Sequence, residues 1–259
     1  MEARRGRTCR LRSGLQDKRG KEGAAAFVAF VEKYPDSNYR ELAGLLAMGV
    51  YDAVKDVGAE IRLAKTLIDF PTALATSRVL GYVTLTNILS AYVTASDSDK
   101  ARKIADLEKW TRCGMEALHA EVRPDNMQPE TFEKNREAPE FAFDRTQGYV
   151  AFLRVDYPAA ILTLERAARL RPGEGTTFLW LGGAKLLSTN PDLSAGLFYI
   201  ARYVVLVPQD SGASGLLKQV YKIVHGSEKG LDDVRTIAKA SATPPVGFTV
   251  IAPPKKEHH

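Results

Sequence analysis

The stretch Gly148 to Pro172, GYVAFLRVDYPAAILTLERAARLRP, decides the fold. Its small and large residues are spaced as two antiparallel helices in close contact require, with Gly148 in the first helix and Ala160, Leu164 and Ala167 in the second. Pro172 closes the unit, because proline cannot continue a helix from the preceding turn. The spacing therefore predicts a helical hairpin whose two helices cover about 139–154 and 157–170.

Prolines recur at regular distances on both sides of this stretch. Pro35, Pro71, Pro139, Pro172 and Pro208 are separated by 36, 68, 33 and 36 residues. A period near 34 is typical of arrays of helical hairpins, and 68 is two such periods. The chain is therefore expected to be all-α, with antiparallel helix pairs stacked one after another.

The remaining parts are assigned from apolar periodicity and turn residues. A single helix over about 22–33 precedes a first repeat over 37–71, in which Leu42, Leu45, Leu46 and Val50 are predicted to point inward. Asp36 or Ser37 is expected to cap its first helix, Ser211 or Ser214 a later one, and Gly226 to end that later helix. The other predicted parts are an enlarged irregular pair over 72–138 with a short extra helix around 129–137, the repeats 139–172 and 173–208, and a capping pair over 209–241.

This pattern resembles that of tetratricopeptide repeats. Besides the opening stretch, residues 173–208 carry Phe178, Leu181 and Gly182 at the spacing of that family. The matching residues of the first repeat are Ala43, Leu46, Ala47, Ala59 and Leu63. The resemblance implies a right-handed superhelix whose first helices line a concave groove for an extended peptide or a partner helix. Residues 25–43, AAFVAFVEKYPDSNYRELA, are also similar to bacterial envelope proteins of this repeat class, including those that help assemble the outer membrane.

The groove residues are predicted to lie one helical turn from the packing residues, on the exposed side of each first helix. They are Met48, Tyr51, Arg145, Tyr149, Phe152, Leu179, Gly183 and Leu186. The subclass that grips a C-terminal carboxylate needs polar and basic groups where this chain has Gly44, Met48, Tyr149, Leu179 and Gly183, so no such clamp is expected. The groove would suit an apolar or amphipathic segment, at roughly micromolar strength, on the order of −8 kcal/mol. The same side chains would equally suit packing against a neighbouring helix or the C-terminal segment.

The net charge of +5 belongs to the N-terminal segment. Residues 1–22 hold eight basic and three acidic residues, which leaves 28 of each sign over residues 23–259. Such a basic segment can bind nucleic acid or an anionic surface, because phosphates release counterions when they are neutralised. This is the alternative function, and nucleic acid is not the expected partner. The other interpretation makes residues 1–21 a disordered leader.

The apolar runs and the C-terminal residues give expectations about the cellular compartment and about the end of the chain. No apolar run is long enough to span a bilayer, so we expect a soluble protein without a transmembrane segment, cytoplasmic, or periplasmic if an upstream signal has been removed. Residues 242–259 are rich in proline and are predicted to be extended, with Phe248, Val250 and Ile251 against the last helices. His258 and His259 resemble the start of a purification tag.

Catalytic and metal-binding patterns were sought and give no candidate residues. Cys9 and Cys113 form no disulfide framework, and His119 and His225 lack the convergent partners that acid–base or metal chemistry needs. We therefore expect no catalytic residue, no metal, no cofactor and no small-molecule substrate. The sequence predicts a non-enzymatic scaffold that binds a protein or peptide partner.

Overall fold

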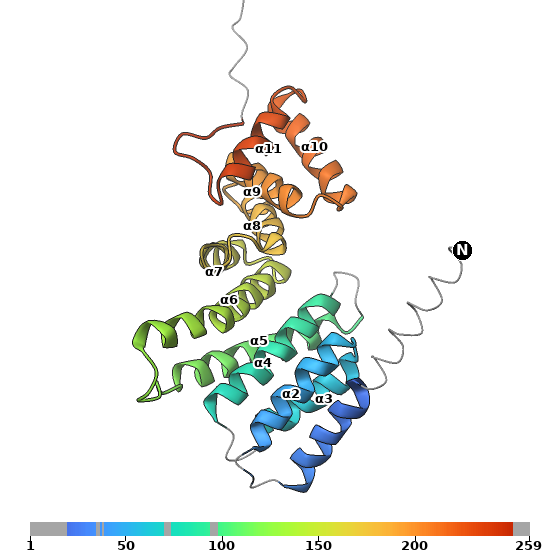
Figure 1. The fold of residues 1–259 in the computed structure, drawn as a ribbon. Coiled ribbons are helices and arrows are strands. Elements are labelled where there is room, and N and C mark those ends of the chain that lie inside the picture. Colours follow the sequence, from blue (N-terminus) through green and yellow to red (C-terminus); the bar gives the residue numbers. More distant parts are fainter. Residues whose placement is uncertain (1–19, 35–36, 38, 70–73, 94–97, 251–259) are drawn as a thin grey trace, which may run out of the picture. The chain divides into compact units, whose positions relative to one another are not determined.

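The fold is known from a computed structural model that describes residues 20–34, 37, 39–69, 74–93 and 98–250 (Figure 1). Every regular element in these residues is an α-helix. The chain divides into two compact units. Unit 1 comprises Met1–Val93 and Lys109–Gln128, and unit 2 comprises Thr94–Glu108 and Pro129–His259, so that α5 (Lys100–His119) contributes residues to both.

Unit 1 is built from a helix over residues 20–33, α2 (Arg40–Ala53), α3 (Val57–Asp69) and α4 (Ala75–Tyr92). The helix α3 packs against both α2 and α4. Small and apolar residues on the facing sides of these helices fill the core, because small side chains let the backbones approach closely. The buried core residues are Ala24, Ala47, Met48, Tyr51, Ala59, Leu63, Ala64, Leu67 and Leu85.

Unit 2 contains α6 (Pro129–Leu153), α7 (Tyr157–Leu170), α8 (Gly175–Leu187), α9 (Leu193–Leu206), α10 (Ser211–His225) and α11 (Leu231–Ala240). Successive helices from α6 to α9 pack on one another, α6 also touches α8, and both α10 and α11 pack on α9 (Figure 1). This neighbour-to-neighbour packing agrees with the predicted helical array. The helix α9 is covered on most of its sides, and nine of its residues are buried.

Glycines set the distance between the helices of unit 2. A Cβ added at Gly148 would stand 2.5 Å from Cγ of Leu164, so α6 and α7 are in contact at the residues that the sequence pairs. A Cβ at Gly182 would stand 2.8 Å from the backbone oxygen of Gly196 and 2.7 Å from Cγ1 of Ile200. These positions accept no larger residue without a shift of the neighbouring helix.

Aspartates begin three helices of unit 2. Asp156, Asp192 and Asp210 precede α7, α9 and α10, and each carboxylate accepts a hydrogen bond from the backbone N–H three residues later, at 2.9 to 3.2 Å. The prediction that Ser211 or Ser214 caps α10 is wrong, because the Asp210 carboxylate already satisfies this N–H group. The prediction that Gly226 ends α10 is confirmed, since its φ of 82° is a left-handed conformation that glycine adopts readily.

The predicted break between a short helix 129–137 and a helix starting at 139 is wrong. Residues 129–153 form one helix with Pro139 inside it. Proline removes one N–H from the backbone hydrogen-bond ladder of this helix. Residues 129–138 are mostly exposed, with Phe132 and Arg136 half-buried, and the loss of one backbone hydrogen bond costs less here than in a core, so the helix continues.

The predicted inward face of α2 is confirmed for Leu45 and Val50, which pack against the core of unit 1, and is wrong for the other two leucines. Leu42 and Leu46 are 54% and 47% exposed, whereas Ala43, Gly44 and Ala47 are buried. A Cβ added at Gly44 would stand 2.6 Å from Cδ2 of Leu67, which shows how closely α3 approaches this side of α2. The small face is buried because it permits close approach, and these two leucines are left on the outside. The predicted cap Asp36 lies outside the described residues, and the N-cap of α2 is Tyr39, with no side-chain hydrogen bond.

The C-terminal segment packs on α9, as the sequence predicts for two of its three apolar residues. Phe248 meets the ring of Phe198 edge to face at a centroid distance of 5.4 Å, and Val250 is 3% exposed. The Val250 N–H donates to Ser194 Oγ at 3.1 Å. Ile251 lies outside the described residues. The segment up to Val250 is therefore part of unit 2 (Figure 1).

Candidate protein-binding surface

Aromatic side chains gather where α6 meets α8. The rings of Tyr149 and Trp180 are stacked, with centroids 4.0 Å apart and planes 17° from parallel. One turn further along α6, the Phe152 ring lies over Gly183, where an added Cβ would stand 3.2 Å from Cε2 of the ring. We call these four residues the α6–α8 face. Trp180, Phe152 and Gly183 are half-buried, so the face keeps accessible apolar surface.

Arg145 lies one turn before Tyr149 on α6. Its guanidinium stands 5.3 Å from the centroid of the Phe141 ring and 3.8 Å from Oε1 of Glu174. Burial lowers the pKa of Arg145, and the negative charge of Glu174 opposes this shift. Burial likewise raises the pKa of the Tyr149 phenol. The guanidinium of Arg145 thus lies at the border of an aromatic surface, and polar groups are also common at the rims of protein interfaces.

Three predicted groove residues are not exposed. Met48 is 4% exposed, Tyr51 9% and Tyr149 8%. Met48 accepts a hydrogen bond on its sulfur from Thr84 of α4 at 3.2 Å, and Tyr149 is covered by Trp180 of α8. The prediction of an open position is wrong for these residues. Met48 and Tyr149 are covered by a later helix of the same unit, whereas Tyr51 lies near Val28 and Val31 of the helix over residues 20–33 and near Leu63 of α3.

Leu179 and Leu186 are half-buried and pack against the core of unit 2, as Phe152 and Trp180 also do. Leu186 meets α9, where a Cβ added at Gly196 would stand 2.6 Å from its Cγ. Sequence reasoning missed Trp180, which is half-buried on the α6–α8 face. Trp180 and Leu187 each follow a predicted groove residue by one position. Together with Thr176 and Gly183 they have helical spacing, and this pattern could have identified Trp180.

A pocket of about 370 Å³ lies between α7, α9 and the start of the C-terminal segment. Its polar lining includes Glu165, Arg169 and the Tyr199 phenol, and Lys185 pairs with Glu165 at 2.9 Å. Burial, with the nearby charges of Glu165 and Asp192, raises the pKa of Tyr199 to about 12. The pocket is therefore walled by fixed polar groups beside the apolar surface of Ala168 and Pro172.

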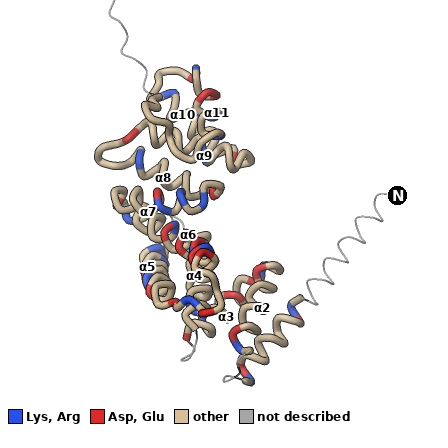
Figure 2. Tube along the Cα trace, turned by 60° about the vertical axis from the view of Figure 1, so that its left-hand side comes forward, with Lys and Arg blue, Asp and Glu red and all other residues tan. Residues whose placement is uncertain are grey.

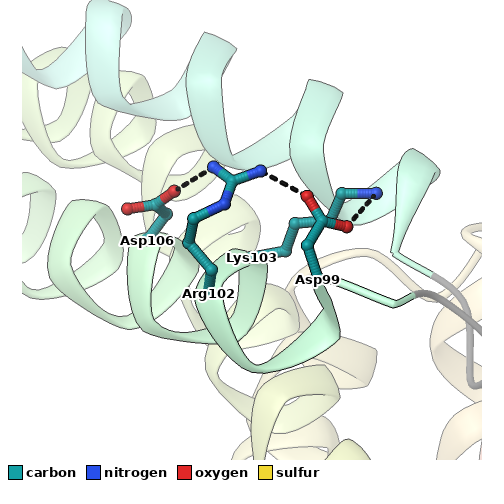
Figure 3. Close-up of polar contacts among 4 residues, drawn as sticks. All are labelled: Asp99, Arg102, Lys103 and Asp106. Carbon is teal, nitrogen blue, oxygen red and sulfur yellow. Dashed lines mark hydrogen bonds and ion pairs between the residues drawn. The ribbon is translucent and has the colours of Figure 1, made fainter.

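Charge is mixed over the described helices. Figure 2 shows Lys and Arg interspersed with Asp and Glu along both units. At the start of α5, Arg102 pairs with Asp99 and with Asp106, the latter at 3.4 Å, and Lys103 pairs with Asp99 at 3.3 Å (Figure 3). The hydrogen bond from Arg102 is the main cause that lowers the pKa of Asp99. These pairs join neighbouring turns of one helix and are exposed, so they support α5 without forming a ligand site.

The two candidate histidines lie in ordinary surroundings. His119 is exposed at the end of α5, and His225 stacks on Tyr221 at a centroid distance of 5.0 Å. Cys113 is half-buried beside Tyr82, whose pKa is raised by burial and by this thiol. Within the described residues, no three His, Cys, Asp or Glu side chains converge as a metal site would require. The same residues contain no helix long and apolar enough to cross a membrane.

Comparison of the chain with protein-family models, with curated proteins and with solved structures finds no match.

Proposed function

We propose that the chain is a non-enzymatic scaffold of the tetratricopeptide type, a right-handed array of helix pairs that binds an apolar or amphipathic segment of another protein. The α6–α8 face supports this function best. The observation that carries the proposal is the stacked pair of Tyr149 and Trp180, which continues into Phe152 over Gly183.

Held aromatic side chains suit a binding surface for a physical reason. A ring that is already stacked loses little rotamer freedom when a partner arrives, so more of the buried apolar area contributes to affinity. Aromatic residues are also enriched among those that dominate the energy of protein interfaces. Leu187, which is 58% exposed and follows Gly183 by one turn of α8, extends the same apolar strip. Arg145 and Glu174 provide a charged border.

The test is affinity capture from a lysate of the source organism with three chains compared quantitatively by mass spectrometry. They are the wild type, the Phe152→Ala/Trp180→Ala variant and a Leu162→Ala control, since Leu162 is 63% exposed on α7. A specific partner is expected to be depleted at least tenfold by the double variant and to be retained by the control. Tyr149 is left unchanged, because removing a ring that is 8% exposed would confound binding with stability.

The same partner bound equally by the wild type and the double variant would remove the α6–α8 face as its site. Circular dichroism of each chain is the necessary control, since the double variant must keep its helicity for the comparison to be valid.

Binding of nucleic acid or of an anionic surface is the alternative function, and it rests on the eight basic residues of segment 1–22. Most of this segment lies outside the described residues. Within them, Lys21 pairs with Asp56 at 3.2 Å. Removing residues 1–19 and measuring retention on nucleic acid at low salt separates the two functions, because electrostatic binding would be lost with the segment.

A further inference from the structure

The pocket between α7, α9 and the start of the C-terminal segment has walls that the chain itself holds in place. Its lining includes Pro172 at the end of α7 and Ala242, which follows the end of α11. Arg202 of α9 ties these two walls together, because its guanidinium donates to the carbonyl of Pro172 at 3.0 Å and to that of Lys239 at 3.1 Å. The volume of about 370 Å³ is that of a small-molecule site, and such sites are usually formed before the ligand arrives.

Tyr199 presents a hydroxyl without a partner to this pocket. The residue is 5% exposed, and its ring stacks on Phe178 at a centroid distance of 6.0 Å and meets Phe198 edge to face at 5.5 Å. These two contacts fix the orientation of the ring. Within the described residues the hydroxyl makes no hydrogen bond, although buried polar groups are nearly always paired. A ligand in the pocket would supply the missing partner.

Arg169 is a second group of the lining without a partner. It follows Glu165 on α7 by four residues, a spacing at which glutamate and arginine commonly pair. Glu165 pairs instead with Lys185 of α8, at 2.9 Å. The part of the chain that the structure describes offers the Arg169 side chain no ion pair and no hydrogen bond. One positive charge of the pocket is therefore left uncompensated.

The two unpartnered groups are suited to an anion. Burial, with the charges of Glu165 and Asp192, raises the pKa of Tyr199 to about 12. The charge of Arg169 opposes this shift, so its guanidinium lies near the phenol. At neutral pH the phenol keeps its proton and can donate it in a hydrogen bond. A guanidinium binds a carboxylate through two parallel hydrogen bonds, so the pair can hold both oxygens of one carboxylate.

We propose that this pocket binds a small organic acid with one carboxylate. Arg169 and Tyr199 hold the carboxylate, and the apolar body of the acid lies against Ala168 and Pro172. The acid carries a single negative charge, because one positive charge is uncompensated and the carboxylate of Glu165 would repel a second. The ligand is bound without being converted. The site lies apart from the α6–α8 face and is independent of its proposed function.

Benzoate is the probe for this site, and benzamide is its matched control, since it has nearly the same shape without the charge. Each is titrated to about 10 mM into the full-length chain, and the amide signals are followed by nuclear magnetic resonance. Benzoate is expected to shift the signals of residues 165–172 and 242–243 and to saturate with a dissociation constant of about 1 mM or below. Benzamide is expected to bind about tenfold more weakly. Benzoate without saturation, or equal binding of the two probes, overturns the proposal.

Variants of Arg169 separate a specific contact from a general effect of charge. Arg169→Gln is expected to weaken benzoate binding about tenfold, and Arg169→Lys to weaken it less, because lysine keeps the charge but not the paired donors. Arg171→Gln is the control, since Arg171 is exposed and does not line the pocket. It is expected to bind benzoate as the wild type does. Equal losses in Arg169→Gln and Arg171→Gln contradict the site.

Tyr199→Phe keeps the ring that packs on Phe178 and removes only the hydroxyl. It is expected to weaken benzoate binding about fivefold. Because this hydroxyl has no hydrogen bond to lose among the described residues, thermal unfolding without benzoate is expected to stay unchanged. A less stable variant with unchanged benzoate affinity would make the hydroxyl structural and would overturn its role.

Two further anions test the class of ligand. Inorganic phosphate cannot use the apolar wall and is expected to bind about tenfold more weakly than benzoate. Equal binding of phosphate would make the pocket a general anion site and overturn the proposal. Hippurate carries its carboxylate on an acylated glycine, as the C-terminus of a peptide does, and is expected to bind no more tightly than benzoate. Markedly tighter binding of hippurate would assign the pocket to a peptide end instead of a small acid.

Discussion

The hairpins α2–α3 of unit 1 and α6–α7 of unit 2 share one turn but differ in how their helices pack. Lys55 and Val155 both adopt a positive φ, of 56° and 65°. One residue later, the carboxylates of Asp56 and Asp156 each accept the N–H of an alanine at 3.2 Å. Equivalent positions in the two hairpins therefore differ by 100 in residue number.

Large and small residues exchange places around this shared turn. Unit 2 sets Gly148 against Leu164, whereas the equivalent positions of unit 1 hold Met48 and Ala64, both buried in its core. A core tolerates such exchanges when the total volume is kept. In both hairpins the two positions are buried, and each pair combines one large residue with one small residue.

The next position distinguishes the two hairpins more sharply. Tyr149 is stacked on Trp180, whereas its equivalent Gly49 is exposed, with nothing within 4 Å of an added Cβ. Unit 2 therefore has an aromatic side chain at a place where unit 1 has none. This difference favours α6 over α2 for the proposed binding surface.

The largest expected effect comes from Leu164→Ala. Leu164 is fully buried, so the substitution is expected to lower the free energy of unfolding of unit 2 by about 3 to 4 kcal/mol. Adding Gly148→Met gives unit 2 the residues of unit 1 and is expected to recover at least about 1 kcal/mol through coupling of the pair. Urea unfolding followed by circular dichroism measures both. If the changes in the free energy of unfolding for the two substitutions simply add, the two positions do not compensate each other in volume, and the prediction is wrong.

Gly148→Ala and Gly49→Ala are expected to act in opposite directions. The first sets a Cβ 2.5 Å from Leu164 and is expected to destabilise unit 2 by about 1 to 3 kcal/mol. The second fills open space inside a helix and is expected to stabilise unit 1 by about 0.5 to 1 kcal/mol. Thermal unfolding of the two variants tests this contrast, and effects of the same sign would break it.

The shared turn itself predicts a matched loss in both units. Asp156→Ala removes the acceptor of the Ala159 N–H and is expected to cost about 1 kcal/mol. Asp56→Ala is expected to destabilise unit 1 through the same loss of a cap. In the wild type, the contribution of Asp56 to the stability of unit 1 also depends on pH. The Ala59 N–H and then Lys21 lower the pKa of Asp56, so its contribution is present above the unfolded-state pKa and is lost as the pH falls through the folded one. In unfolding experiments, the stability of the Asp56→Ala variant should therefore fall less with acid than that of the wild type. An equally steep fall in both chains would contradict this prediction.

The effect expected at Tyr203 is no larger at neutral pH than that of the aspartate caps. Its hydroxyl donates to Oδ2 of Asp210 at 2.7 Å, and this hydrogen bond, with burial, raises its pKa to about 12. A raised pKa stabilises the folded state below about pH 10, and this stability is lost as the pH rises toward 12. Tyr203→Phe is expected to cost about 1 kcal/mol at pH 7 and to reduce the alkaline loss. Unfolding between pH 8 and 11 measures the difference between the two chains.

The helices and their turns could be predicted because local residues determine them. The bounds of α7 and α9 follow from the proline and aspartate turns, and the contact of Gly148 with Leu164 follows from their spacing. The packed face of α2 could not be predicted, since RELAGLLAMGVYDA is apolar on more than one side. Only the approach of α3 decides that the small face is buried.

The candidate surface was predicted in part for a similar reason. Position and spacing identify Phe152, but they cannot show that α8 would cover Tyr149 with Trp180. Exposure of a side chain on one helix depends on the size of the residue that a later helix brings to it. Pro139 illustrates the same limit, because a proline favours a break at this point and α6 nevertheless continues through it.

Arg202 joins two segments of unit 2 through main-chain atoms alone. Its guanidinium donates to the backbone carbonyls of Pro172, Ala238 and Lys239, at 2.9 to 3.1 Å. Because these acceptors belong to the main chain, Pro172 and Lys239 can be replaced without loss of the contact, whereas Arg202 cannot. The joint between the end of α7 and the end of α11 thus depends on the side chain of Arg202 and on main-chain atoms of the two segments that it joins.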